Sequence, residues 1–184
     1  MSKMIDLRSD TVTLPSDKMR EAITGAKLGD DVFGEDPTIN ELEAKAAKIM
    51  GKEQGLLVPS GTMGNLVSIL VHCQRGTEII LGDKSHTFIY EAGGISAFGG
   101  IHSRQLKNND NGTMDLNEIK NAIRVDNVHF PRTSAISLEN THNMCHGAPL
   151  PAEYVNLVAN IAKENELNLH IDGARIFNAA IALD

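Results

Sequence analysis

The sequence has 184 residues, of which 41% are hydrophobic and 22% are charged, and its formal net charge is −7. This composition is typical of a single globular domain, and the acidic balance argues against nucleic acid or an anionic membrane as the main partner. The longest apolar stretch, LVSILV at 66–71, is too short to span a membrane, and the first ten residues lack an apolar signal core. We therefore expect a cytoplasmic protein with reduced cysteines.

Hydrophobic spacing and capping residues predict helices that alternate with short strands along the chain. The predicted helices cover residues 16–26, 37–50, 61–74, a stretch after 86, 115–123 and about 154–162. The predicted strands cover residues 55–58, 77–83, 101–106, 133–140 and 167–174. The glycine-rich stretch GGISAFGG at 93–100 is interpreted as a helix end and a turn. This order predicts an α/β fold with a mostly parallel sheet and helices on both faces.

Polar residues gather directly after four of the predicted strands. These four clusters are Ser60–Asn65, Asp83–His86, Glu139–His142 and Asp172–Arg175. In open parallel sheets, ligands bind beyond the carboxyl ends of the strands. We therefore expect the four clusters to converge on one crevice.

The first three clusters each allow a functional and a structural interpretation. The turn PSGTMGN at 59–65 opens a helix, so its amides suit a phosphate, although a tight strand-to-helix turn explains it equally well. His86 could stack on a planar ring or exchange protons. Asn140 and His142 are expected to face the crevice. The spacing of His142, Cys145 and His146 is a weak zinc signal, so no metal is predicted.

Asp172 ends an apolar strand, where a carboxylate is costly to bury unless it is paired. Its partner could be Arg175, three residues on. Alternatively, both could serve a ligand with one positive and one anionic group. Pyridoxal 5'-phosphate with a carboxylate substrate satisfies all four clusters, because it carries a phosphate and a ring nitrogen that a carboxylate keeps protonated.

Six stretches in order resemble the threonine aldolases, which are pyridoxal phosphate enzymes of the aspartate-aminotransferase-like fold (fold type I). The six stretches are IDLRSDTVTLPS (5–16), GDDVFGEDPT (29–38), PSGTMGN (59–65), GDKSH (82–86), LENTHN (138–143) and HIDGARIFNAA (170–180). The resemblance implies that Gly61 and Thr62 bind the cofactor phosphate. It also implies that His86 stacks on the pyridine ring and Asp172 pairs with the ring nitrogen.

The same resemblance implies residues for the substrate and the reaction. Ser9 and Arg175 would hold the substrate carboxylate, His129 would lie near the substrate hydroxyl, and Tyr90 would place an aromatic ring near the site. The implied reaction cleaves L-threonine or L-allo-threonine to glycine and acetaldehyde. The implied assembly is a homodimer or homotetramer, because the family forms its active sites at a subunit interface.

The resemblance also predicts an incomplete large domain. The family binds its cofactor covalently through a lysine downstream of the Asp-x-x-Arg motif, and this chain has no lysine after Lys163. We expect an N-terminal arm at 1–15, a cofactor-binding large domain at 16–184, and no C-terminal small domain. The chain alone is expected to be inactive. The alternatives are a non-catalytic fragment that binds pyridoxal phosphate or phosphate, and a related β-eliminating amino-acid lyase.

Overall fold

The computed structural model describes residues 5–184, which form two units, one up to Leu57 and one from Val58 to Asp184. The first contains the 3-10 helix η1 (Asp10–Val12) and the helices α1 (Asp17–Thr24) and α2 (Pro37–Met50).

The two helices of the first unit begin and end at the predicted signals. The Ser16 hydroxyl caps α1 by accepting a hydrogen bond from the Met19 amide. The Asp36 carboxylate caps α2 by accepting from the amides of Thr38 (2.9 Å) and Ile39 (3.0 Å). Gly51 ends α2 in the left-handed conformation that glycine adopts without a steric cost. Both predicted helices are confirmed.

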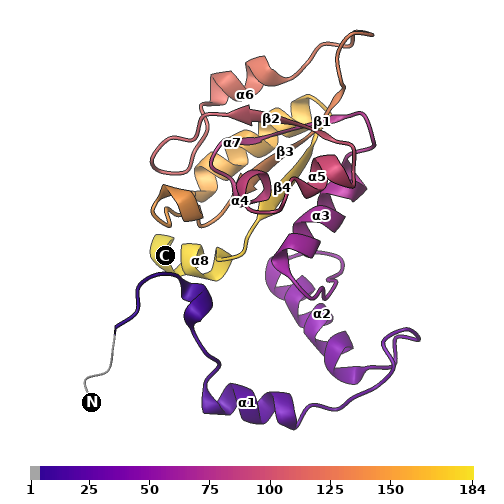
Figure 1. Cartoon of the computed structure of the whole chain (residues 1–184), viewed down its shortest axis with the longest axis vertical. Helices are drawn as coiled ribbons and strands as arrows, with labels where there is room; N and C mark the ends of the chain where they lie inside the picture. Colours follow the sequence, from indigo (N-terminus) through magenta and orange to yellow (C-terminus); the bar gives the residue numbers. More distant parts are fainter. Residues whose placement is uncertain (1–4) are drawn as a thin grey trace. The chain divides into compact units, whose positions relative to one another are not determined.

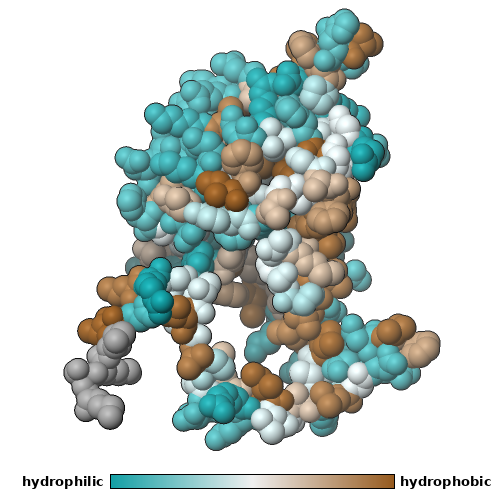
Figure 2. Space-filling view, viewed as in Figure 1, coloured by the Kyte–Doolittle hydropathy of each residue, from teal (hydrophilic) through white to brown (hydrophobic). Residues whose placement is uncertain are grey.

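The described part of the first unit buries very little of its own surface. Of residues 5–57, only Asp36 and Ala47 are buried. Leu7, Leu14 and Leu28 are each more than four-fifths exposed, and Figure 2 shows apolar residues on the surface of the molecule. This unit therefore lacks a hydrophobic core of its own within the described residues.

The strand predicted at residues 55–58 is wrong, because this segment has no regular structure. The Leu57 amide donates a hydrogen bond to Glu43 Oε1 (2.6 Å) in place of a ladder bond to a neighbouring strand. An apolar run of four residues carries no information about whether a partner strand is within reach.

The second unit is built on a parallel sheet of four strands (Figure 1). The strands are β1 (Glu78–Gly82), β2 (His102–Leu106), β3 (Thr133–Glu139) and β4 (Asn168–Asp172), in the order β2-β1-β3-β4. Every pairing between neighbours is parallel. The predicted α/β fold with a parallel sheet is confirmed.

Helices connect these strands and cover both faces of the sheet. They are α3 (Gly61–His72), α4 (His86–Ile89), α5 (Gly94–Ala97), α6 (Leu116–Ala122), α7 (Ala152–Glu164), α8 (Ile176–Leu183) and the 3-10 helix η2 (Asn143–Cys145). Helix α5 replaces the predicted helix end and turn, because Gly93, with φ +65°, lets the chain start a new helical turn. No helix among residues 5–184 is long and apolar enough to cross a membrane.

The core lies in two layers, one on each side of the sheet. Ile80 and Ile136 pack with Val158 in the layer that α6 and α7 cover. Ile79 and Leu81 pack with other apolar residues in the layer beneath α3 and α5. Neighbouring residues of β1 thus point to opposite faces, and both faces are buried, as expected for a parallel sheet.

Candidate functional site

Three of the four predicted polar clusters meet at the carboxyl edge of the sheet. Glu139 and Asp172 end β3 and β4 and are paired in the ladder, and β1 ends at Gly82, just before the cluster that contains His86. The fourth cluster follows no strand, but it reaches the same place on helix α3. Asn65 Nδ2 donates a hydrogen bond to Asp172 Oδ2 (2.9 Å). The predicted convergence is therefore present in the second unit.

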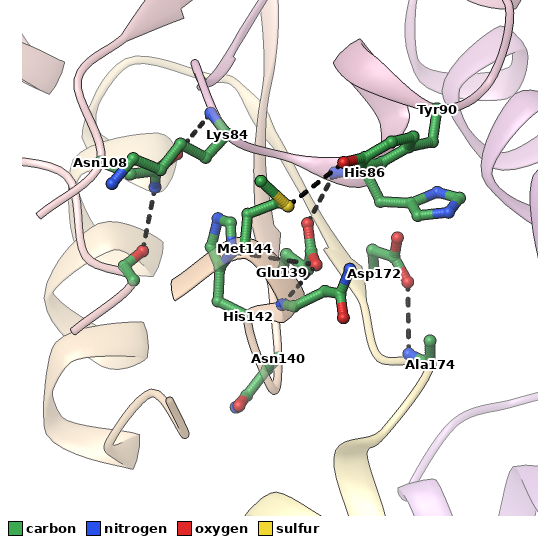
Figure 3. Close-up of polar contacts among 12 residues, drawn as sticks. Lys84, His86, Tyr90, Asn108, Glu139, Asn140, His142, Met144, Asp172 and Ala174 are labelled. Atoms are coloured by element: carbon green, nitrogen blue, oxygen red, sulfur yellow. Dashed lines mark hydrogen bonds and ion pairs between the residues drawn. The ribbon is translucent and has the colours of Figure 1, made fainter. Parts of the chain in front are cut away.

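His86 begins the short helix α4 at this edge. Its backbone amide donates to Glu139 Oε2 (2.7 Å), and its ring Nδ1 lies 2.9 Å from Glu91 Oε1. The phenol ring of Tyr90 lies 5.5 Å from the imidazole, between ring centres. Figure 3 shows the His86 imidazole, the Tyr90 ring and the Asp172 carboxylate close together. The structure thus brings these three predicted residues together.

Asp172 is half-buried rather than deeply buried. Its Oδ2 accepts from Asn65, and its Oδ1 accepts from the amide of Ala174 (3.2 Å). Two donors in an accessible position stabilise the carboxylate and leave it able to face a ligand. Arg175 lies three residues further along, at the N-cap of α8.

Glu91 and His170, two polar residues that sequence reasoning did not single out, complete this group. Glu91 is buried, and its Oε1 accepts from Asn65 Nδ2 (2.7 Å) in addition to contacting His86. Asn65 Oδ1 in turn lies 3.0 Å from His170 Nε2. One ligand-type atom each from His86, Glu91 and Asp172 lie within 4.8 Å of one another. The Asn65 amide therefore bridges two carboxylates that would otherwise repel each other.

The start of helix α3 lies one helical turn from this group. Ser60 Oγ caps the helix by accepting from the Met63 amide (3.1 Å), so Gly61 and Thr62 are its first residues. No atom of residues 5–184 lies within 4 Å of where a Cβ on Gly61 would stand. A helix N-terminus attracts anions. Four residues of helix, about 6 Å, separate this end from Asn65.

Two residues from the sequence analysis, His129 and Asn140, do not join this group in the second unit. His129 lies before β3. This strand has seven residues, so the start of β3 is about 20 Å from the carboxyl edge. Ser9 lies in the first unit, where its side chain caps η1. The Asn140 side chain is occupied by two hydrogen bonds with the backbone of Leu150 (3.0 and 3.3 Å).

His142 is buried beside Glu139, and neither of its ring nitrogens has a hydrogen-bond partner among the described residues. Burial is the main cause that lowers its pKa, and the charge of Lys84 acts in the same direction. The carboxylates of Glu139, Asp83 and Asp172 oppose this shift. His142 is therefore neutral in the folded chain at neutral pH.

This burial predicts a loss of stability in acid. The folded pKa of His142 lies below the unfolded value of about 6.5, so the unfolded chain binds more protons as pH falls below that value. His142→Leu should reduce the pH dependence of the free energy of unfolding between about pH 7 and 5, by at most about 1.4 kcal/mol per pH unit. Urea unfolding at both pH values measures this. The exposed His146 supplies the control His146→Asn, and an equal change in both variants would contradict the prediction.

The model of the beta-eliminating lyase family matches residues 6–184. Low-specificity L-threonine aldolase 1 of Arabidopsis thaliana is 55% identical over 184 residues, which cover 98% of this chain and 51% of that protein. The low specificity L-threonine aldolase of Escherichia coli (strain K12) is 48% identical over 179 residues, which cover 97% and 53%. The chain thus spans about half the length of the curated relatives it matches.

Solved structures show the same fold. A protein of Exiguobacterium sp. 255-15, described as an aromatic amino acid beta-eliminating lyase/threonine aldolase, matches with a TM-score of 0.71 and 24% identity, over 87% of this chain and 43% of that one. A 3-amino-5-hydroxybenzoic acid synthase matches with a TM-score of 0.62 and 20% identity, over 86% and 38%. At these identities the likeness establishes the fold alone.

Proposed function

The chain belongs to the beta-eliminating lyase family, and from that membership we propose that it is part of a pyridoxal phosphate-dependent lyase that cleaves L-threonine or L-allo-threonine to glycine and acetaldehyde. The names of the relatives favour this substrate class. One observation carries the proposal for this chain. Asp172 is hydrogen-bonded to Asn65 on the first turns of α3 and lies beside His86, at the carboxyl edge of the sheet.

The residues at this edge fit the cofactor. The half-buried carboxylate of Asp172 suits a protonated ring nitrogen, and the N-terminal turn of α3 at Gly61 and Thr62 suits a phosphate. His86 offers a flat ring whose centre lies 5.5 Å from that of Tyr90. When bound, pyridoxal phosphate supplies the electron-withdrawing ring that such a cleavage needs.

Other residues of the chain would bind the amino acid and move its proton. Arg175, at the start of α8, offers a guanidinium that matches a carboxylate in two-pronged geometry, and we assign Ser9 to the same carboxylate. His86 can take the proton of the substrate hydroxyl. His129 lies too far from Asp172 within one chain to act there, so the role that the resemblance implies for it would need a second copy of the chain.

A related reaction, β-elimination, uses the same contacts to ring and phosphate, and the family name favours it as the second candidate.

Product analysis separates the two reactions. A protein that contains these 184 residues should convert L-threonine to glycine and acetaldehyde in the presence of pyridoxal phosphate. Ammonia and a keto acid without glycine would overturn the aldolase proposal. Residues 1–184 alone serve as the control and should be inactive. They contain no lysine after Lys163, and the resemblance implies that a lysine downstream of the Asp-x-x-Arg motif binds the cofactor covalently.

A further inference from the structure

Glu91 holds a central place in the polar group at the carboxyl edge. Its side chain is only 3% exposed. A single oxygen, Oε1, lies 2.9 Å from His86 Nδ1 and 2.7 Å from Asn65 Nδ2. A buried carboxylate is stable only when donors surround it, so His86 Nδ1 and Asn65 Nδ2 must both donate hydrogen bonds to Glu91.

The orientation of the Asn65 amide makes Glu91 Oε1 a hydrogen-bond acceptor. Its nitrogen lies against both Glu91 and Asp172, and its oxygen lies 3.0 Å from His170 Nε2. The reverse orientation would place the amide oxygen against two carboxylates. An amide oxygen only accepts, so His170 donates from Nε2; burial lowers the pKa of His170, so its ring is neutral and carries only this hydrogen. The amide therefore has one favourable orientation, with its NH₂ group between the carboxylates.

The contact between Glu91 and His86 then fixes where the imidazole proton lies. An ionised carboxylate only accepts, so His86 Nδ1 carries a hydrogen. The other ring nitrogen, Nε2, has no hydrogen-bond partner among residues 5–184, and the side chain is 39% exposed. In the neutral ring, Nε2 is then the nitrogen with a free electron pair. Because the side chain is accessible, a ligand can reach this nitrogen.

We propose that Glu91 is a positioning residue that keeps a proton on Nδ1 of His86 and leaves Nε2 as the nitrogen that exchanges protons with the substrate. The tautomer follows from the contacts of this chain alone. The part that Nε2 plays toward a substrate rests on the proposed function. Glu91 touches neither cofactor nor substrate in this scheme and acts through His86, as carboxylates behind catalytic imidazoles do.

The tautomer can be measured directly by NMR on the 184-residue chain labelled with ¹⁵N-histidine. Long-range ¹H–¹⁵N correlation distinguishes the two neutral tautomers and the imidazolium, and the His86 signals are assigned by their loss in His86→Gln. We expect a proton on Nδ1 at neutral pH, in the neutral or the cationic ring. A neutral His86 with its proton on Nε2 would overturn the proposal without any Glu91 variant. In that case Glu91 would either donate a hydrogen bond to Nδ1 or make no hydrogen bond with His86.

Variants of Glu91 test the cause. Glu91→Leu removes the acceptor and should abolish the preference for Nδ1–H, whereas Glu91→Gln keeps an acceptor oxygen and should retain most of it. Glu164→Gln, at an exposed position of α7, should leave the spectrum unchanged. A folded Glu91→Leu variant with the wild-type tautomer would overturn the proposal; if that variant does not fold, the wild-type spectrum decides.

The proposed function has its own readout in the same samples. Adding pyridoxine 5'-phosphate should shift the His86 signals if the cofactor site is correctly placed. The absence of such a shift would count against the proposed function and leave the assignment of the Nδ1 proton standing.

Discussion

Asp172→Asn should weaken the binding of pyridoxine 5'-phosphate by about 10- to 150-fold. The substitution would remove the charge from the proposed hydrogen bond to the protonated ring nitrogen, and hydrogen bonds to charged groups contribute about 1.5–3 kcal/mol. Pyridoxine 5'-phosphate is the suitable probe because it lacks the aldehyde that reacts with lysine amines. Isothermal titration of the 184-residue chain measures its dissociation constant. The contacts to Asn65 and Ala174 show that residue 172 is held in place without the ligand.

Asp110→Asn is the matched control, because the Asp110 side chain is 98% exposed and its partner Lys84 lies 4.0 Å away. This variant should bind the probe as the unchanged chain does, since surface ion pairs contribute little. Equal weakening by both substitutions would show that general charge, and not the position of Asp172, governs binding. No measurable binding by the unchanged chain would contradict the proposed cofactor site.

Glu78→Ala should lower the free energy of unfolding by about 3–5 kcal/mol, which is the usual cost of removing one partner from a buried ion pair. Glu78 begins β1 and is completely buried. Arg124 Nε lies 3.1 and 3.0 Å from its two oxygens, and the side chains of Arg104 and His102 lie 3.7 and 3.6 Å away. Without Glu78, the guanidinium groups of Arg124 and Arg104 lose their shared acceptor next to the core.

Urea unfolding at neutral pH measures this loss of stability. Glu164 is exposed, so the control Glu164→Ala should change the free energy of unfolding by less than about 0.5 kcal/mol. Because Glu78 lies at the end of β1 remote from the polar group at the carboxyl edge, a variant that remains folded should still bind pyridoxine 5'-phosphate. A stability change as small as that of Glu164→Ala would show that the pair contributes specificity rather than stability.

Local sequence signals predicted the periodic parts of the fold. Asp36 before Pro37 and Gly51 after Met50 mark the ends of α2, because capping depends only on residues within one turn. The strand predicted at 55–58 failed because pairing depends on a partner distant in sequence. Helix α8 was not predicted, although its eight residues, IFNAAIAL, favour helix after Arg175.

The candidate site was predictable to the extent that topology determines it. In a parallel sheet, the residues after each strand share one edge, so the meeting of His86 and Asp172 followed from their places after β1 and in β4. Glu91 lies five residues after His86, a separation that matches neither helical nor strand periodicity. The short helix α4 and the turn after it bring its carboxylate back to the imidazole.

By itself, the sequence determined the α/β class, the caps of its helices, the polar residues at the strand ends and the resemblance to a lyase family. These features depend on local chemistry or on the order of elements along the chain. Only the tertiary structure decided that Asn65 donates to both Glu91 and Asp172, which lie 26 and 107 residues further along the chain, and that His129 precedes β3 at the opposite end of that strand. Such hydrogen bonds depend on how α3 packs against the sheet, and packing has no signature in a single stretch of sequence.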